Sequence, residues 1–303
     1  MDRRTFLKII GTGVAGATTG DLLTAGKSSA GERISGKEFY GILVDTTRCI
    51  GCRRCEKACA EVNGLPNPDI SEGTNETVFQ SLRQTTDKQY TVTNKYDTEK
   101  GTIFVPKRCM HCNQPGCTVA CPTKAMKKRP TGHVTWDSNC IGCRLCMVSC
   151  PFDVPKFEYG KAMPNIQKCN LCWDRFKQGV LPACVEVCPT QALMAGTRRQ
   201  ILDDGKRRIS MNPDKYVDHI FGEYEVGGTS HLYLSAVPFE QIGFRKDLGT
   251  KPYPEYSSFY FKTVPLVATL TPLFMLAVSA AIKMGKESQK QKHEEKHEEK
   301  GKH

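Results

Sequence analysis

Sixteen cysteines are the residues of this 303-residue chain whose type and spacing could do chemistry. They fall into four tight groups, and no cysteine of the sequence lies outside them. Thiolates in such numbers either bind metal or form disulfides, and the tight grouping favours metal. In chain order the groups are Cys49, Cys52, Cys55 and Cys59; Cys109, Cys112, Cys117 and Cys121; Cys140, Cys143, Cys146 and Cys150; and Cys169, Cys172, Cys184 and Cys188.

Groups one and three share the spacing C-x2-C-x2-C-x3-C, the bacterial ferredoxin pattern for [4Fe–4S] clusters. A tight loop places three cysteines around one iron–sulfur cube, whereas the fourth lies in a following helix and ligates the neighbouring cluster. Two such runs therefore exchange fourth cysteines and bind two clusters. Group two lengthens one gap, and group four separates Cys172 from Cys184 by eleven residues. Proline follows the last cysteine in groups two to four, but group one has Ala60, a departure that removes no ligand.

Other cysteine chemistry fits this pattern less well. Zinc sites use well-separated cysteine pairs, disulfide frameworks are typical of small secreted domains, and c-type haem needs a C-x-x-C-H motif, which the sequence lacks. His111 inside group two is expected to be a neighbour of a cluster and not a ligand. Lysines crowd the last twenty residues, and the net charge of +11 forms no basic stripe with aromatic residues, so no nucleic-acid partner is expected.

Short strands are predicted to lead into the cysteine loops, at residues 41–45 and 134–137. Residues 60–108 form a polar insert whose alternating segments predict added strands, either as a passive surface hairpin or as a contact with a partner. Residues 231–239, HLYLSAVPF, predict a further strand. The expected fold class is α+β: two ferredoxin-like 2×[4Fe–4S] units in one domain, residues 31–250, with the β insert and a C-terminal transmembrane helix.

The N-terminal residues 1–30 resemble a twin-arginine export signal. Arg3 and Arg4 are followed by Thr-Phe-Leu-Lys and by a Gly-rich apolar stretch too weak to span a bilayer. Small residues at positions 28–31 predict cleavage after Ala30. The resemblance implies export of a folded protein with its cofactor inserted, so the thiols would be loaded in the reducing cytoplasm.

Residues 263–282 carry no charge and predict a transmembrane helix, because at 1.5 Å per residue they span about 30 Å. Membrane helices tolerate Pro265 and Pro272 better than soluble helices do. Lysines follow, so the C-terminus is expected in the cytoplasm and the body on the periplasmic side of the inner membrane. Residues 251–262 are expected to be a linker, and the charged tail 283–303 to be disordered.

The four cysteine groups resemble those of the four-cluster iron–sulfur subunits of the dimethyl-sulfoxide-reductase and formate-dehydrogenase family, over about residues 39–200. This resemblance implies nested pairing, in which group one shares clusters with group four and group two with group three. The implied ligands are Cys49, Cys52, Cys55 and Cys188 for cluster 1; Cys59, Cys169, Cys172 and Cys184 for cluster 2; Cys109, Cys112, Cys117 and Cys150 for cluster 3; and Cys121, Cys140, Cys143 and Cys146 for cluster 4.

Within this family, the export signal joined to a C-terminal helix and the stretch 227–244, GGTSHLYLSAVPFEQIGF, are similar to the ferredoxin-type subunit of the periplasmic [NiFe] hydrogenase-2 complex. The resemblance implies that the chain transfers electrons between a [NiFe] hydrogenase, made of a large and a small subunit, and an integral membrane quinone-reactive subunit. No nucleophile, base pair or phosphate loop accompanies the cysteines, so no catalytic residue is expected. The alternatives are a beta subunit of a formate dehydrogenase or other molybdopterin oxidoreductase, and a structural or assembly metal protein.

Overall fold

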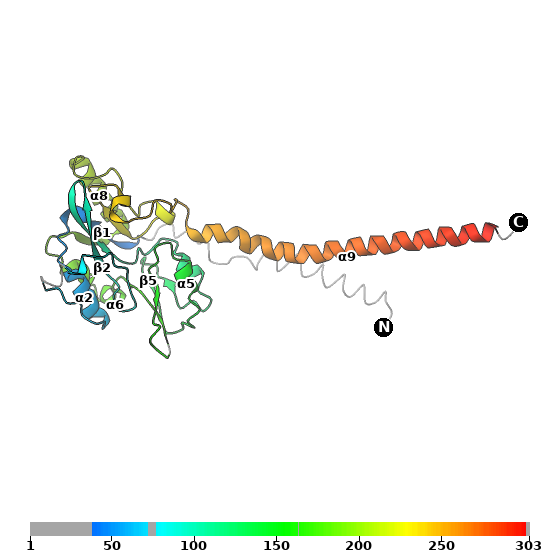
Figure 1. Cartoon of the computed structure of the whole chain (residues 1–303), viewed down its shortest axis with the longest axis horizontal. Coiled ribbons are helices and arrows are strands. Elements are labelled where there is room, and N and C mark those ends of the chain that lie inside the picture. The colour runs from blue at the N-terminus through cyan, green and yellow to red at the C-terminus, as the bar shows by residue number, and fades with distance from the viewer. Residues whose placement is uncertain (1–37, 72–76, 163, 301–303) are drawn as a thin grey trace. The chain divides into compact units, whose positions relative to one another are not determined.

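The computed structural model describes residues 38–71, 77–162 and 164–300 (Figure 1). The chain divides into two compact units, one ending at Pro254 and the other beginning at Glu255. The predicted export signal, with Arg3 and Arg4, lies outside the described residues.

A three-stranded sheet forms the centre of the first unit. Its middle strand β1 (Tyr40–Asp45) pairs antiparallel with β8 (Leu193–Thr197) and parallel with β9 (His231–Leu234). Successive side chains of a strand point to opposite faces of the sheet, so β1 contributes side chains to two apolar cores. Leu43 packs toward helix α8, whereas Ile42 and Val44 face a core that also contains cysteines.

Helix α8 (Arg198–Met211) begins with a capping box, in which Thr197 and Gln200 satisfy each other's backbone N–H groups. It covers one face of the sheet through Ile201 and Ile209. The predicted strand 231–239 ends early, at Leu234, because the segment after it turns at Pro238 into the 3-10 helix η3 (Phe239–Ile242). Two other 3-10 helices are η1 (Thr46–Arg48) and η2 (Glu225–Gly227).

Each cysteine group follows a strand and runs into at least one short helix. The sequence predicted such strands before groups one and three and in the insert that precedes group two, and the structure has them before all four. The strands are β1, β3 (Gly101–Lys107), β5 (Val134–Thr135) and β7 (Ile166–Gln167); the helices are α2 (Arg54–Asn63), α4 (Gly116–Val119), α5 (Leu145–Val148), α6 (Trp173–Lys177) and α7 (Ala183–Glu186).

Long-range pairing joins the groups two by two. Strand β1 before group one pairs with β8 after group four, and helices α2 and α7 pack together. Strand β4 (Lys127–Lys128) after group two pairs with β5 before group three, and α4 packs against α5. β6 (Lys156–Phe157) pairs with β7. Because β4 offers β5 only two partner residues, the predicted strand 134–137 ends at Thr135.

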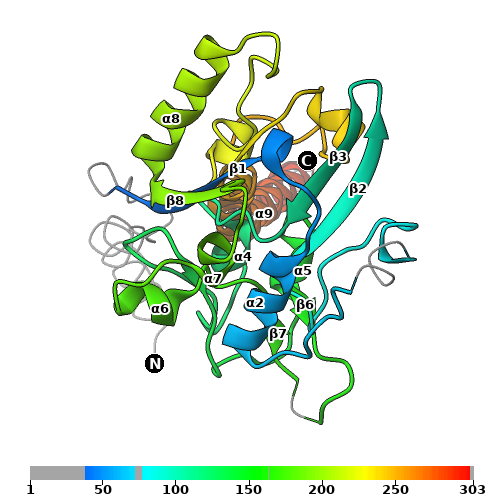
Figure 2. The same ribbon diagram turned by 90° about the vertical axis from the view of Figure 1, so that its left-hand side faces the viewer.

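The insert contains the hairpin of β2 (Val92–Thr98) and β3, visible in Figure 2. A buried carboxylate on α2 ties this hairpin to group one. Glu56 accepts hydrogen bonds from the Thr93 backbone N–H and from Arg83 Nη2, both at 2.6 Å. The inner face of the insert therefore packs against the first cysteine loop, so the hairpin is more than a surface appendage.

Helix α9 (Tyr253–Lys300) forms the second unit from Glu255 onward, and its first two residues belong to the first unit. Its segment Thr263–Lys286 has a mean hydropathy of 1.9 and is long and apolar enough to cross a membrane, and none of it is buried within the described structure. Thr269 and Thr271 donate their hydroxyls back to carbonyl groups of the preceding turn, which is how such residues satisfy their polarity in lipid.

The backbone of α9 also differs from the expectation for the tail. Residues 283–300 are helical, so the prediction of disorder is wrong for them. Glu, Lys and Gln dominate this stretch and are good helix formers. Most of the expected linker 251–262 is likewise part of α9, which begins at Tyr253.

Candidate metal centre

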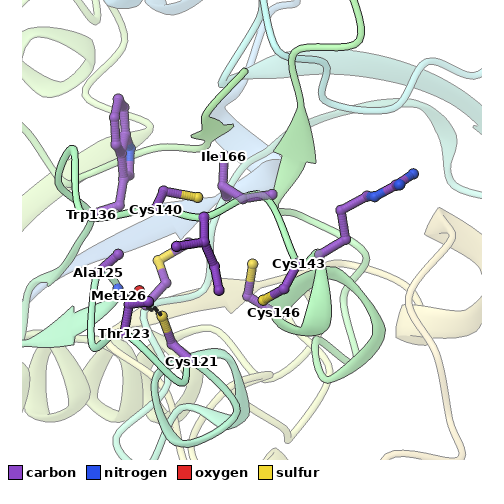
Figure 3. A pocket seen from close by; sticks show the side chains of 11 residues that line it. Cys121, Thr123, Ala125, Met126, Trp136, Cys140, Cys143, Cys146 and Ile166 are labelled. Carbon is purple, nitrogen blue, oxygen red and sulfur yellow. Dashed lines mark hydrogen bonds between the residues drawn. The ribbon is translucent and has the colours of Figure 1, made fainter. Parts of the chain in front are cut away.

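Two cavities in the first unit are each lined by four cysteines. One contains Cys121, Cys140, Cys143 and Cys146, called set 4, whose sulfurs face a common space (Figure 3). The other contains Cys49, Cys52, Cys55 and Cys188, called set 1. Each cavity has a volume of about 20 Å³, so two distant parts of the chain build cages of similar size.

The nested pairing predicts two further sets for the remaining eight cysteines, and their charges act on one another in the structure. Burial raises the pKa of Cys169 well above its ordinary value, and repulsion from Cys59, Cys109 and Cys172 raises it further. Burial and then repulsion from Cys184 raise the pKa of Cys172. Cys59, Cys169, Cys172 and Cys184 are called set 2. Burial and then repulsion from Cys150, Cys109 and Cys117 raise the pKa of Cys112; those four are set 3.

The four sets follow one another in a row. Besides burial, the pKa of Cys55 in set 1 is raised by Cys184 in set 2. In the same way, Cys109 in set 3 raises the pKa of Cys169 in set 2, and Cys146 in set 4 raises the pKa of Cys117 in set 3. These electrostatic influences are consistent with the order 1, 2, 3, 4. The order differs from that of the groups along the chain because each set mixes two groups.

Left-handed backbone turns shape each loop in the same way. The residue before the second cysteine of every group has a positive φ: Gly51 (71°), His111 (48°), Gly142 (70°) and Leu171 (57°). Such turns direct successive N–H groups toward one side, which favours negative charge there. The Leu171 N–H lies 3.4 Å from Cys169 Sγ, and the Met126 N–H lies 3.5 Å from Cys121 Sγ.

Group one departs from the others after its last cysteine. In groups two to four, the last cysteine is followed by proline, and the second residue after that proline lies in the left-handed region. These residues are Lys124, Asp153 and Gln191. Group one has Ala60 in place of proline, so α2 continues past Cys59 to Asn63 and ends at Gly64. The substitution therefore lengthens a helix and leaves Cys59 in its set.

The chemistry of these sets suits an iron–sulfur cluster. All sixteen cysteines are free thiols. Among the described residues no three His, Cys, Asp or Glu side chains are close enough to share one metal ion. Burial raises the pKa of Cys49 and Cys146 to about 11 and of Cys55 to about 12, so thiolates there need a strong positive charge such as iron.

Two buried cations, Arg108 and Lys168, and the half-buried Lys128 lie beside the inner sets, and the sequence did not predict them. Arg108 Nη1 lies 2.9 Å from Cys184 Sγ, and its Nε and Nη2 have no partner. Lys168 donates to the carbonyl of Cys169, and Lys128 to that of Cys112. Burial lowers the pKa of Lys128 to about 7. A usable signal was present, because Arg108 and Lys168 each directly precede the first cysteine of a group.

The predicted neighbour His111 is fully buried beside set 3. Its Nδ1 accepts a hydrogen bond from the Val134 N–H at 2.9 Å, and its ring lies 5.4 Å from that of His231. Burial lowers the pKa of both histidines, so they are neutral at physiological pH.

Comparison with known proteins assigns this arrangement to a family. Residues 48–125 and 101–198 each match a family described as "4Fe-4S dicluster domain". The Hydrogenase-2 operon protein HybA of Escherichia coli O157:H7 is 35% identical over 291 residues, covering 82% of this chain and 86% of the relative. The chain belongs to the family of [4Fe–4S] dicluster iron–sulfur subunits.

Other members of the family extend the comparison. A protein of Nitratidesulfovibrio vulgaris is 44% identical over 287 residues, covering 93% of this chain and 77% of the relative. The Formate dehydrogenase-O iron-sulfur subunit of Escherichia coli K12 is 32% identical, covering 70% of this chain and 71% of the relative. The chain is therefore an iron–sulfur electron-transfer subunit, non-catalytic in itself, and its sixteen cysteines are consistent with four [4Fe–4S] clusters.

Proposed function

We propose that this chain holds one [4Fe–4S] cluster in each of its four cysteine sets and carries electrons between a periplasmic [NiFe] hydrogenase and a membrane quinone-reactive subunit. The observation that carries the proposal is the row of sets, in which each set lies beside the next. Four separate metal sites with structural roles would not need to be adjacent. A continuous row is what electron transfer from one end to the other requires.

In this scheme the protein's own residues hold the clusters, orient them and shield them from water. When bound, a [4Fe–4S] cluster takes up and releases single electrons. The thiolates hold the iron, and N–H groups of the left-handed turns bond to sulfur. The insert excludes water from set 1, where Thr93 Oγ1 lies 3.7 Å from Cys55 Sγ and Phe104 covers Gly51.

Electrons enter and leave at the two ends of the row. Cys143 of set 4 is exposed, as is Ile141 beside it at 67%. At set 1, Ile50 is 58% exposed. The middle sets contain Cys59, Cys109, Cys117 and Cys184, all of which are buried. Apolar side chains around the two end sets provide surfaces on which partner subunits can exclude water.

The hydrogenase assignment is supported by the relative named Hydrogenase-2 operon protein. The partners would be the large and small [NiFe] subunits at one end of the row and an integral membrane subunit at the other. The apolar segment of α9 supports a membrane anchor. Together with the export signal and the lysines after this segment, it supports a periplasmic body and a cytoplasmic C-terminus.

The test is to purify the full-length chain from membranes with its natural partners under anaerobic conditions. The proposal expects about sixteen iron atoms per chain, since each cluster contains four, together with co-purifying [NiFe] subunits. It also expects electron paramagnetic resonance signals of reduced clusters to develop when hydrogen gas is supplied. A complex that lacks a hydrogenase, or clusters that hydrogen leaves oxidised, would contradict it.

A formate dehydrogenase complex is the second candidate, favoured by the relatives named as formate dehydrogenase iron-sulfur subunits. It predicts a molybdopterin-containing partner and reduction of the clusters by formate instead of hydrogen. Clusters that cannot be reduced reversibly by any donor would favour a structural or assembly role.

A further inference from the structure

Arg108 occupies an unusual place among the cysteines. It directly precedes Cys109 of group two, yet its side chain reaches group four, where Nη1 lies 2.9 Å from Cys184 Sγ. The side chain is only 3% exposed. Its charge also acts on Cys55 of set 1, where it opposes the effect of burial on the thiol. The guanidinium therefore lies between sets 1 and 2.

The charge of Arg108 has no carboxylate partner. It takes part in none of the ion pairs found among the described residues, and its Nε and Nη2 donate no hydrogen bond. Burying an unpaired charge is strongly unfavourable, and arginine cannot escape the cost by losing its proton. Sulfur ligands with net negative charge are what this guanidinium can pair with inside the protein.

We propose that Arg108 raises the reduction potential of the cluster in set 2, and to a smaller extent that in set 1, by stabilising the added electron. The inference rests on the proposed assignment of one cluster to each set. Reduction by one electron adds one negative charge inside the cage, breaks no bond and moves no proton. A fixed cation at hydrogen-bond distance from a ligand sulfur stabilises the reduced state more than the oxidised state, and burial strengthens this effect because the dielectric constant is low.

Set 4 provides an internal comparison. The nearest arginine in its loop, Arg144, stacks on Phe157 and Tyr159, and Cys143 is exposed to solvent. Water screens charges around the exposed Cys143, whereas Arg108 is only 3% exposed. The effect of Arg108 should therefore be confined to one end of the row.

The experiment is a redox titration of the full-length cluster-loaded protein, poised with mediators and dithionite as the electron donor and followed by electron paramagnetic resonance. Arg108→Gln removes the charge and keeps an amide donor, and Arg108→Lys keeps the charge. Arg198→Gln is the matched control, because this arginine donates to the carbonyls of Thr229 and Glu223 and its electrostatic partners are Glu223 and Tyr224.

Arg108→Gln is expected to lower the reduced-to-oxidised ratio of one cluster at least tenfold at a given potential, a shift of about 59 mV for one electron. The affected signal should be the one that Cys184→Ser removes. Arg108→Lys and Arg198→Gln should stay within threefold of the wild type. Unchanged potentials in Arg108→Gln would overturn the proposal, as would loss of iron from that variant, since the role would then be assembly. Wild-type protein without reversibly reducible clusters would instead refute the proposed function.

Discussion

Replacing Glu56 by Gln should destabilise the first unit strongly, because this carboxylate is buried and compensates two arginines. Its side chain is 1% exposed, and that of Arg53, with Nη2 3.1 Å from Glu56 Oε2, is 2% exposed. Arg83 Nη2 and the Thr93 N–H both lie 2.6 Å from Oε1. Gln has the same shape, so no cavity forms. The loss is therefore that of the charge partner, and removing one member of a buried ion pair costs about 3–5 kcal/mol.

For a unit of this size about 1 kcal/mol lowers the thermal midpoint by roughly 2–4 °C, so Glu56→Gln should lower it by roughly 6–20 °C. The assay is thermal unfolding of the full-length cluster-loaded protein at one fixed scan rate without oxygen. Glu186→Gln is the matched control, since Glu186 also lies in a cysteine helix but is 54% exposed in its ion pair with Arg175, which is worth less than about 1 kcal/mol. Equal midpoints for the two variants would refute the reasoning, because the buried network would then contribute no more than a surface pair.

Three further outcomes are expected. Gly51→Ala should cost roughly 2–5 kcal/mol, because left-handed strain adds to contact with an aromatic ring whose nearest carbon lies 2.5 Å from the new Cβ. Gly64→Ala, also left-handed but in open space, should cost only about 1–2 kcal/mol; equal thermal midpoints would argue against the ring contact. Cys49→Ser and Cys188→Ser should change the same paramagnetic signal and Cys184→Ser a different one, and a common signal for all three would disprove the proposed sets. Truncation before α9 should release the protein from carbonate-washed membranes with its iron content unchanged, and a variant that stays in the pellet would show that another element anchors it.

Much of the site could be predicted from local spacing. The gaps in the cysteine groups specify tight loops, and the structure adds positive φ angles at Gly51 and Gly142, where the sequence has glycine. The same turn at His111 and Leu171 carries no such signal, because these residues adopt it only under constraint from their surroundings. The strand before group four was missed for a related reason: β7 has two residues, too few to show a period.

The insert and the buried charges could not be read from the sequence. Glu56 and Arg83 are 27 residues apart, and Arg108 and Cys184 are 76 apart. Charged residues are usually exposed, so a sequence pattern assigns them to the surface by default. Only tertiary packing, which brings Thr93 of β2 to Glu56 of α2 and Arg108 to Cys184 of α7, removes water from them.

The sequence by itself determined the chemistry of this protein, because thiolate ligands three residues apart must lie in one loop whatever the rest of the chain does. Tertiary structure decided which loops share a cage and in what order the cages stand. That outcome depends on β1 pairing with β8 and on α4 packing against α5. Contacts between such distant segments depend on the burial of whole apolar faces, and no local pattern of residues encodes them.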